Sequence, residues 1–274
     1  MMDDHRTAVV RGFMLAFGLL LGLGCEAERD AYQDALEGMA SSDPRRKDRA
    51  TYKFVEIRFN KGGDYPHWKL PPIGSGPLPP HPEDARVRQL MAERIKGRYR
   101  DPVAVKVLAL LRSPHTEPEL IRCAIDERGG NFKCLEALAV TAFPADLSEV
   151  SRHLDESLAT QFALAFRGHA LPHLQEIAAF ERAPRCRWAI GGLTILRVQE
   201  RELYAPSVVA TAAALRNRDA ACRTYAVEVI GQHIGYQHLL IPALLDPSDE
   251  VARVAREIVD GTRPPTRTID TPYD

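Results

Sequence analysis

The sequence of 274 residues predicts an all-α fold, in which about five helical hairpins stack side by side as an α-solenoid. An apolar stripe with helical spacing recurs five times between residues 135 and 259, at intervals of 24 to 36 residues. Segments suited to a second helix lie between these stripes. Periods of this length with two helices each are typical of solenoids, because one helical pair cannot bury its apolar face alone.

Composition limits the classes of protein to consider. Hydrophobic residues make up 45% of the chain, which is enough for a core and excludes wholesale disorder. The formal net charge is -1, whereas nucleic-acid-binding proteins normally carry a basic surplus. We therefore expect no nucleic-acid partner.

Residues 1–24 are expected to be a signal peptide. Arg6 and Arg11 supply positive charge before an apolar run from Gly12 to Gly24. This run of 13 residues without a polar side chain is shorter than the roughly 20 residues that a membrane-spanning helix needs. The run ends at Leu21-Gly22-Leu23-Gly24-Cys25, which resembles the lipobox of bacterial lipoproteins, although Gly22 stands where that family usually has Leu. The resemblance implies a lipid on Cys25 and an anchored protein in the bacterial cell envelope, facing the periplasm or the cell surface. An ordinary cleaved signal peptide, a short uncleaved anchor and a buried core helix are the alternatives.

Residues 25–60 are expected to form a short helical segment. Apolar residues lie on one side of a helix from Glu28 to Met39. The β-branched and aromatic residues of 51–59 suit either a strand or a helix. We favour a helix, because strict alternation fails at Phe54-Val55 and the glycines that follow residue 59 would end one.

A Gly- and Pro-rich loop or linker is predicted over residues 61–82. Its six prolines between residues 71 and 82 exclude a helix or a central strand, and a new helix should begin at Glu83-Asp84. The loop also gathers residue types common in binding sites. The alternative is that its tryptophan only fixes the loop to the first helices of the solenoid. The candidate binding residues are Asp64, Tyr65, His67 and Trp68.

The solenoid is predicted over residues 83–261, followed by an extended tail over 262–274 that contains three prolines. The five stripes predict first helices, and the segments between them predict second helices. The stripes span residues 135–143, 159–166, 186–194, 222–230 and 251–259, and the second helices span 147–154, 171–180, 205–215 and 236–244.

Two segments resemble HEAT-like repeats: Asp219-Ala220-Ala221-Cys222-Arg223-Thr224-Tyr225-Ala226, and Asp246-Pro247-Ser248-Asp249-Glu250-Val251-Ala252-Arg253-Val254-Ala255. Both match the family's Asp-containing turn followed by an apolar-Arg-x-x-Ala helix. The resemblance implies a protein or peptide partner on a concave face lined by second helices, and Asp and Arg side chains stacked between repeats. The i, i+4 spacing of Asp219 with Arg223 and of Asp249 with Arg253 predicts two structural ion pairs.

Four cysteines remain if Cys25 carries a lipid. Cys123 and Cys134 lie about equally far from Arg128-Gly129-Gly130, a predicted hairpin turn, so a disulfide between them is sterically allowed. Cys186 and Cys222 occupy equivalent positions on neighbouring first helices, whose axes lie about 8–10 Å apart, which makes a disulfide marginal. We favour four buried thiols.

The sequence offers no catalytic, cofactor or metal motif. It has no Cys-x-x-Cys, no His-Glu-x-x-His and no phosphate-binding glycine loop. His169 and His173 are four residues apart, but Pro172 marks a helix start between them. We expect an envelope lipoprotein whose solenoid is a binding scaffold and not an enzyme. The alternative is an enzyme built on a HEAT-like array, of the DNA-glycosylase or lyase type, which the export signal and the neutral charge oppose.

Overall fold

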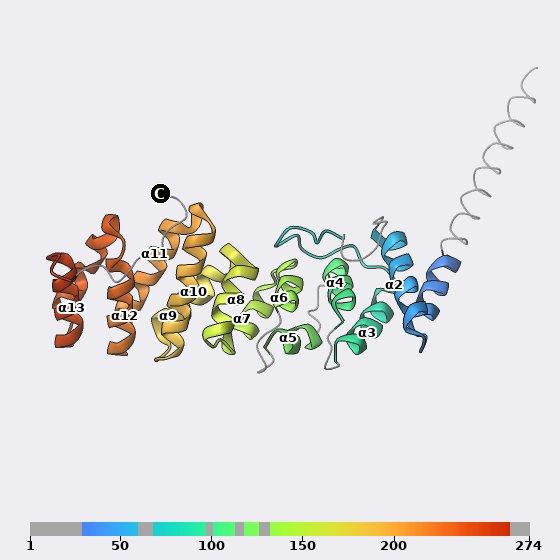
Figure 1. The fold of residues 1–274 in the computed structure, drawn as a ribbon, viewed down its shortest axis with the longest axis horizontal. Coiled ribbons are helices and arrows are strands. Elements are labelled where there is room, and N and C mark those ends of the chain that lie inside the picture. Colours follow the sequence, from blue (N-terminus) through green and yellow to red (C-terminus); the bar gives the residue numbers. More distant parts are fainter. Residues whose placement is uncertain (1–28, 60–67, 97–100, 113–117, 126–131, 264–274) are drawn as a thin grey trace, which may run out of the picture. The chain divides into compact units, whose positions relative to one another are not determined.

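The computed structural model describes residues 29–59, 68–96, 101–112, 118–125 and 132–263. Every regular element within these ranges is a helix, and none of them contains a strand (Figure 1). The predicted all-α class is therefore confirmed. The described chain forms two compact units.

The first unit contains the residues up to Leu70 together with Pro80–Arg94. A helix over residues 29–39 packs with α2 (Pro44–Phe59) and α3 (Asp84–Ile95). Leu36, Phe54 and Met91 are fully buried between these helices. The prediction that residues 51–59 are helical is confirmed, since they form the second half of α2.

The start of α3 is held by the end of α2. Arg58 donates from Nε and Nη2 to the two carboxylate oxygens of Asp84, at 3.2 and 3.1 Å. This two-pronged geometry is the strongest form of a charged hydrogen bond, and it places a carboxylate at the positive end of α3. The helix starts where the sequence predicts. The residues Pro80–Arg94, which include most of α3, belong to this first unit.

The second unit contains Pro71–Pro79 and the chain from Ile95 onward. Prolines and Asp caps mark the start of several of its helices, as at Asp101, which accepts from the amides of Val103 and Ala104. Its helices are α4 (Pro102–Leu111), α5 (Pro118–Ile125), α6 (Phe132–Ala139), α7 (Pro144–Arg152), α8 (Glu156–Phe166), η1 (Arg167–Ala170), α9 (Leu171–Phe180), α10 (Arg185–Gln199), η2 (Arg201–Leu203), α11 (Tyr204–Ala213), η3 (Ala214–Arg216), α12 (Ala220–Gly231), η4 (Ile234–Leu245) and α13 (Asp249–Val259).

The helices of the second unit pack in two layers. In the first layer, α4 contacts α6, α6 contacts α8, α8 contacts α10, α10 contacts α12, and α12 contacts α13. In the second layer, α5 contacts α7, α7 contacts α9, α9 contacts α11, and α11 contacts η4. Each layer is therefore built from alternate helices of the chain. Contacts such as those of α10 with α9 and α11 join the layers.

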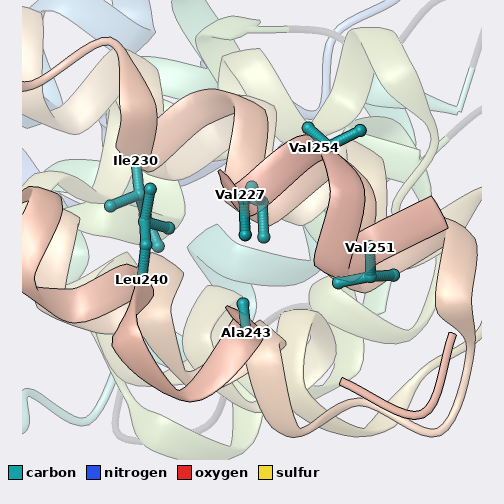
Figure 2. Packing of buried hydrophobic residues seen from close by; sticks show 7 residues of the cluster. Val227, Ile230, Leu240, Ala243, Val251 and Val254 are labelled. Atoms are coloured by element: carbon teal, nitrogen blue, oxygen red, sulfur yellow. The ribbon is translucent and has the colours of Figure 1, made fainter. Parts of the chain in front are cut away.

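The apolar stripes form the core between the layers. In α10 the stripe residues Cys186, Ala189, Ile190 and Leu193 are fully buried. In the last hairpin, side chains of α12, η4 and α13 meet in one cluster, which Figure 2 shows from close by. Burying each Val, Leu or Ile contributes about 1.5–3 kcal/mol, so the stripes stabilise contacts between successive hairpins. The cluster contains Val227, Ile230, Leu240, Ala243, Val251, Val254 and Ala255.

Two predicted helices differ in the structure. The stripe over residues 135–143 leaves the helix early, because α6 ends at Ala139 and Ala142 has a φ of 50°. Pro144 holds the preceding Phe143 in an extended conformation, with a ψ of 130°. The last second helix is the 3-10 helix η4, which contains Pro242, a residue without the N–H that an α-helix interior requires.

The proline-rich loop contains neither helix nor strand over its described residues, as predicted, and Pro71–Pro79 lies against the helices of the second unit. The amides of Gly74 and Ser75 donate to the carbonyls of Ala139 and Val140, at 3.1 and 2.8 Å. The amide of Leu78 donates to the carbonyl of Arg112, at 3.4 Å. The loop thereby donates hydrogen bonds to carbonyls at the ends of α4 and α6. Carbonyls at the end of a helix receive no hydrogen bond from within that helix.

Candidate functional site

The binding loop predicted from sequence is described only at Trp68, because Asp64, Tyr65 and His67 lie outside the described residues. Trp68 is 3% exposed, and its ring meets that of Tyr52 edge-on, with centroids 5.4 Å apart. Its burial supports the alternative in which Trp68 fixes the loop, although its partner Tyr52 belongs to α2 and not to a helix of the predicted solenoid. The tryptophan is therefore a core residue of the first unit rather than an exposed anchor for a partner.

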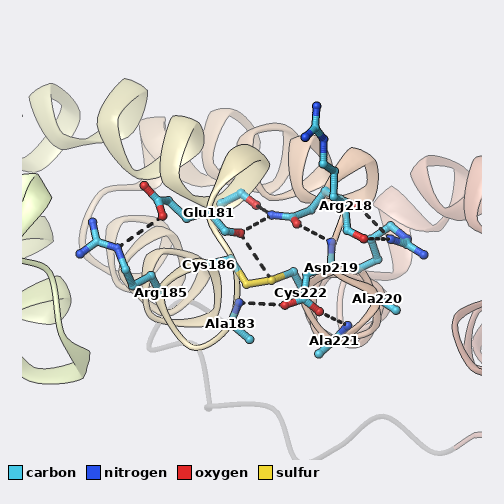
Figure 3. The surroundings of a disulfide bond; sticks show 12 residues. Glu181, Ala183, Arg185, Cys186, Arg218, Asp219, Ala220, Ala221 and Cys222 are labelled. Carbon is cyan, nitrogen blue, oxygen red and sulfur yellow. Dashed lines mark hydrogen bonds and ion pairs between the residues drawn. A yellow bond between two sulfur atoms is a disulfide. The ribbon is translucent and has the colours of Figure 1, made fainter.

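All four described cysteines form disulfides, so the favoured expectation of four thiols is wrong. One disulfide joins Cys123 of α5 to Cys134 of α6, across a predicted hairpin turn. The other joins Cys186 to Cys222, with the Cα atoms 6.0 Å apart (Figure 3). An average distance of about 8–10 Å between helix axes would make this disulfide marginal. The two cysteines lie instead in the first turns of α10 and α12, where the backbones approach more closely.

Polar side chains around the second disulfide join one hairpin to the next. The Asn217 amide donates to the carbonyls of Ala178 and Glu181 at the end of α9, at 2.9 and 2.7 Å. Asp219 accepts from the amide of Ala183 at 3.0 Å, and it caps α12 through the amide of Ala221 at 2.9 Å. These backbone hydrogen bonds lower the pKa of Asp219, and the bond from Ala183 has the largest effect.

The two predicted i, i+4 ion pairs do not form. Since the Asp219 carboxylate caps α12, Arg223 donates instead to both carboxylate oxygens of Asp246, at 2.7 and 2.9 Å. Arg253 pairs with Glu257, one turn further along α13, and not with Asp249. The hydrogen bond to Asp246 raises the pKa of Arg223. The pair joins α12 to the turn before α13, so its charges do act between successive hairpins.

A buried polar cluster, which the sequence analysis missed, lies where α10, α11 and α12 meet. Arg197 and Tyr204 bond the two ring nitrogens of His233, and the tyrosine hydroxyl lies 2.8 Å from Nδ1. Burial, with the charge of Arg197 as a second cause, lowers the pKa of His233 to about 4. The histidine is therefore neutral at pH 7. The only sign of this contact in the sequence is that Arg197 and His233 are 36 residues apart, which is the length of one repeat.

The two histidines at 169 and 173 do not share a site. His169 lies in η1, whereas His173 lies on α9, where burial lowers its pKa. His173 lines a small groove of about 220 Å³ between α7 and α9, together with Arg152, Glu176 and Phe180. Within the described residues, no group of His, Cys, Asp and Glu is arranged to hold a metal ion.

The exposed apolar side chains concentrate on the second layer. Among the described residues, the large apolar side chains with the highest exposure are Leu245 (90%), Phe180 (82%), Ile241 (61%) and Val209 (55%). All four lie on α9, α11 or η4, which are consecutive second-layer helices, and α11 contacts both of the others. Large apolar side chains that stay exposed on neighbouring helices suggest an interaction surface. We call these four residues the second-layer apolar row.

Comparisons with known proteins give no assignment: no family model matches the chain, and no curated protein or solved structure matches it. None of the helices within the described ranges is both long and apolar enough to cross a bilayer.

The candidate site consists of the second-layer apolar row and the adjoining groove between α7 and α9.

Proposed function

We propose that this protein is a lipid-anchored component of the bacterial cell envelope, and that its hairpins form a HEAT-like solenoid that binds an apolar segment of another protein. The two layers support the solenoid, because a helix in either layer packs against the helix two places further along the chain, as α6 does against α8 and α7 does against α9. The Arg223–Asp246 pair between successive hairpins is a further support, since Asp and Arg side chains stack between repeats in that family.

The cysteines support export. Disulfides persist in oxidising compartments such as the bacterial periplasm, and are rare in reducing ones. The two disulfides use all four cysteines of the described chain, so none of these is left to pair with Cys25. A cysteine outside the disulfide framework and directly after an apolar run suits lipid attachment.

The observation that carries the binding function is the second-layer apolar row. Its four side chains belong to three neighbouring helices, and Phe180 also lines the groove between α7 and α9. A partner that covers Phe180 and Leu245 would remove two almost fully exposed apolar side chains from water, which favours association. Arg152, Glu176 and Arg185 around the groove offer polar contacts at its rim.

The binding proposal is tested by crosslinking and mass spectrometry on the tagged, full-length protein in its own envelope. The variant carries Phe180→Ser and Leu245→Ser, and the matched control is Val259→Ser, which changes an exposed apolar residue of the first-layer helix α13. We expect one partner crosslinked to second-layer helices, lost in the double variant and kept in the control. Equal crosslinking of all three proteins would refute the proposed face.

The anchor is tested separately by metabolic labelling with a fatty acid. We expect the wild-type protein to be labelled and the Cys25→Ala variant to be unlabelled and released from the membrane fraction. Label on both proteins, or on neither, would refute lipid attachment at Cys25. This result does not depend on whether a partner is found.

A further inference from the structure

We propose that the partner segment bound at the second-layer apolar row is acidic between its apolar residues, and that its carboxylates meet Arg182, Arg216 and Arg218. This inference rests on the proposed function, because it names the chemistry of the segment that the row would bind. The three arginines lie at or just after the ends of α9 and η3, within the second unit.

The ends of neighbouring second-layer helices alternate between apolar and basic side chains. Phe180 is the last residue of α9, Arg216 is the last residue of η3, which continues α11, and Leu245 is the last residue of η4. All three side chains are exposed. Since α11 contacts both α9 and η4, Arg216 lies between the two apolar side chains. This order fits a segment that carries negative charge between two apolar residues.

Asn217 joins the turn after η3, which carries Arg216 and Arg218, to the turn after α9, which carries Arg182. Its buried side-chain amide donates to the carbonyl of Glu181 at 2.7 Å. The disulfide in Figure 3 joins the helices that follow these two turns, and the Arg218 side chain points away from it. All three arginines are exposed, so they form one basic surface next to the apolar row.

The carboxylates at this junction already have partners. Glu181 faces Arg185, with its Oε2 3.7 Å from the arginine Nε. Asp219 accepts hydrogen bonds from two backbone amides. No acidic side chain of the described residues forms an ion pair with Arg216 or Arg218. Grouped arginines with free guanidinium groups are typical of surfaces that bind acidic segments.

The other end of the row carries the opposite charge, which favours a protein segment over a membrane. Leu245 is followed by Asp249 and Glu250, which are both exposed. A membrane of anionic lipids is negative over its whole surface and would be repelled by these carboxylates. A protein segment can instead place its acidic residues at Arg216 and leave the residues near Leu245 neutral or basic.

The spacing of the helices determines the spacing of the apolar residues in the segment. Packed helix axes lie about 8–10 Å apart, so Phe180 and Leu245 are about 16–20 Å apart along the row. An extended chain advances about 3.3 Å per residue, so the two apolar residues of the segment would lie about five or six positions apart. We expect the acidic residues in the middle of this stretch, opposite Arg216.

The test is fluorescence anisotropy with fluorescein-labelled peptides and the purified full-length protein. Each peptide has two leucines about six positions apart in a Gly-Ser background, with three aspartates between them in one peptide and three lysines in the other. We expect the wild-type protein to bind the aspartate peptide at least about fivefold more tightly, because one partly exposed ion pair contributes up to about that factor. The difference should shrink when salt is raised from about 0.1 M to about 0.5 M, because salt screens exposed charges.

Arg216→Glu is the variant, and Arg201→Glu is the matched control, because it makes the same change of charge at the other end of α11. We expect Arg216→Glu to bind the aspartate peptide about fivefold more weakly than wild type does, and the lysine peptide more tightly. Arg201→Glu should bind both peptides as wild type does. The gained affinity for the lysine peptide separates a loss of charge from a loss of folding, since an unfolded variant would not gain it.

Three outcomes would overturn this inference. Equal affinities of wild type for the two peptides, with both lost in Phe180→Ser/Leu245→Ser, would leave the proposed function in place without an acidic segment. Equal effects of Arg216→Glu and Arg201→Glu, or no binding of either peptide to wild type, would also contradict it. Binding of wild type but not of Arg216→Glu to phosphatidylglycerol vesicles, without binding of the aspartate peptide, would show that the arginines face a membrane.

Discussion

Loss of the disulfide between Cys186 and Cys222 should be the most costly single covalent change in the second unit. The disulfide joins residues 36 positions apart, and the loop that it closes contains α11 and parts of α10 and α12. Closing a loop of this length lowers the entropy of the unfolded chain enough to stabilise the fold by about 3.8 kcal/mol. The disulfide between Cys123 and Cys134 closes a loop of 11 residues, which gives about 2.8 kcal/mol by the same relation.

The assay is urea unfolding of wild-type protein and of Cys186→Ala/Cys222→Ala, each with and without reducing agent. Without reductant, we expect the variant to be less stable by about 3–4 kcal/mol and to have a steeper dependence on urea, because its unfolded state is less compact. With reductant, both proteins lack both disulfides, and their difference should fall to the cost of the lost sulfur packing.

Thiol counting gives an independent check. Mature wild-type protein that is denatured without reductant should show no free thiol if Cys25 carries a lipid, and the variant should show none either. A count of four in the wild-type protein, or a difference in stability that is equal with and without reductant, would refute the reasoning from the disulfide.

The remaining predictions concern single side chains. Asp246→Asn should lower the free energy of unfolding by about 3 kcal/mol, measured in urea, because it leaves the buried Arg223 guanidinium without its carboxylate. Asp146 is buried, and one of its carboxylate oxygens lacks a hydrogen bond. Burial raises the pKa of Asp146 to about 6. The folded protein therefore keeps a proton on this carboxyl group that the unfolded chain releases near pH 4. Its contribution to stability therefore falls as the pH rises from about 4 to about 6, and Asp146→Asn should be more stable than wild type by up to about 3 kcal/mol at pH 7.5, with no difference below pH 4. An unchanged difference across this range would contradict the assignment. Gly192→Ala should destabilise α10 by about 1–3 kcal/mol in thermal unfolding, because its Cβ would lie 3.1 Å from a leucine side chain and 3.2 Å from a backbone carbonyl. Gly191→Ala, with no atom within 4 Å of the new Cβ, should instead stabilise the same helix by up to about 1 kcal/mol.

The helices could be predicted from sequence because their stripes are periodic and local. The stripe of α10 and its successors at α12 and α13 predict both the helices and their buried faces, since apolar side chains at i, i+3, i+4 and i+7 lie on one side of a helix. The boundary at Pro144 was missed, because a stripe carries no information on the conformation that a proline imposes on its predecessor.

The polar contacts of the candidate sites could not be predicted in the same way. Arg223 has a carboxylate four residues away, at Asp219, and another 23 residues away, at Asp246. Spacing within one helix favours Asp219 as the partner of Arg223. Because Asp219 caps α12, Arg223 pairs with Asp246 instead. The same holds for Arg197 and His233, which become neighbours only when α10 and α12 pack together. Residue spacing within one helix reports i, i+4 neighbours, whereas these partners are set by contacts between hairpins.

The proline-rich loop has a consequence for dividing the chain. Pro71–Pro79 belongs to the second unit, although the residues on both sides of it belong to the first. A fragment that begins at Ile95 would contain every helix from α4 to α13, yet it would lack the amides that satisfy Ala139, Val140 and Arg112. The two units therefore cannot be separated by one cut, and a shortened version of the array needs residues 71–79 supplied in trans or fused to its amino end.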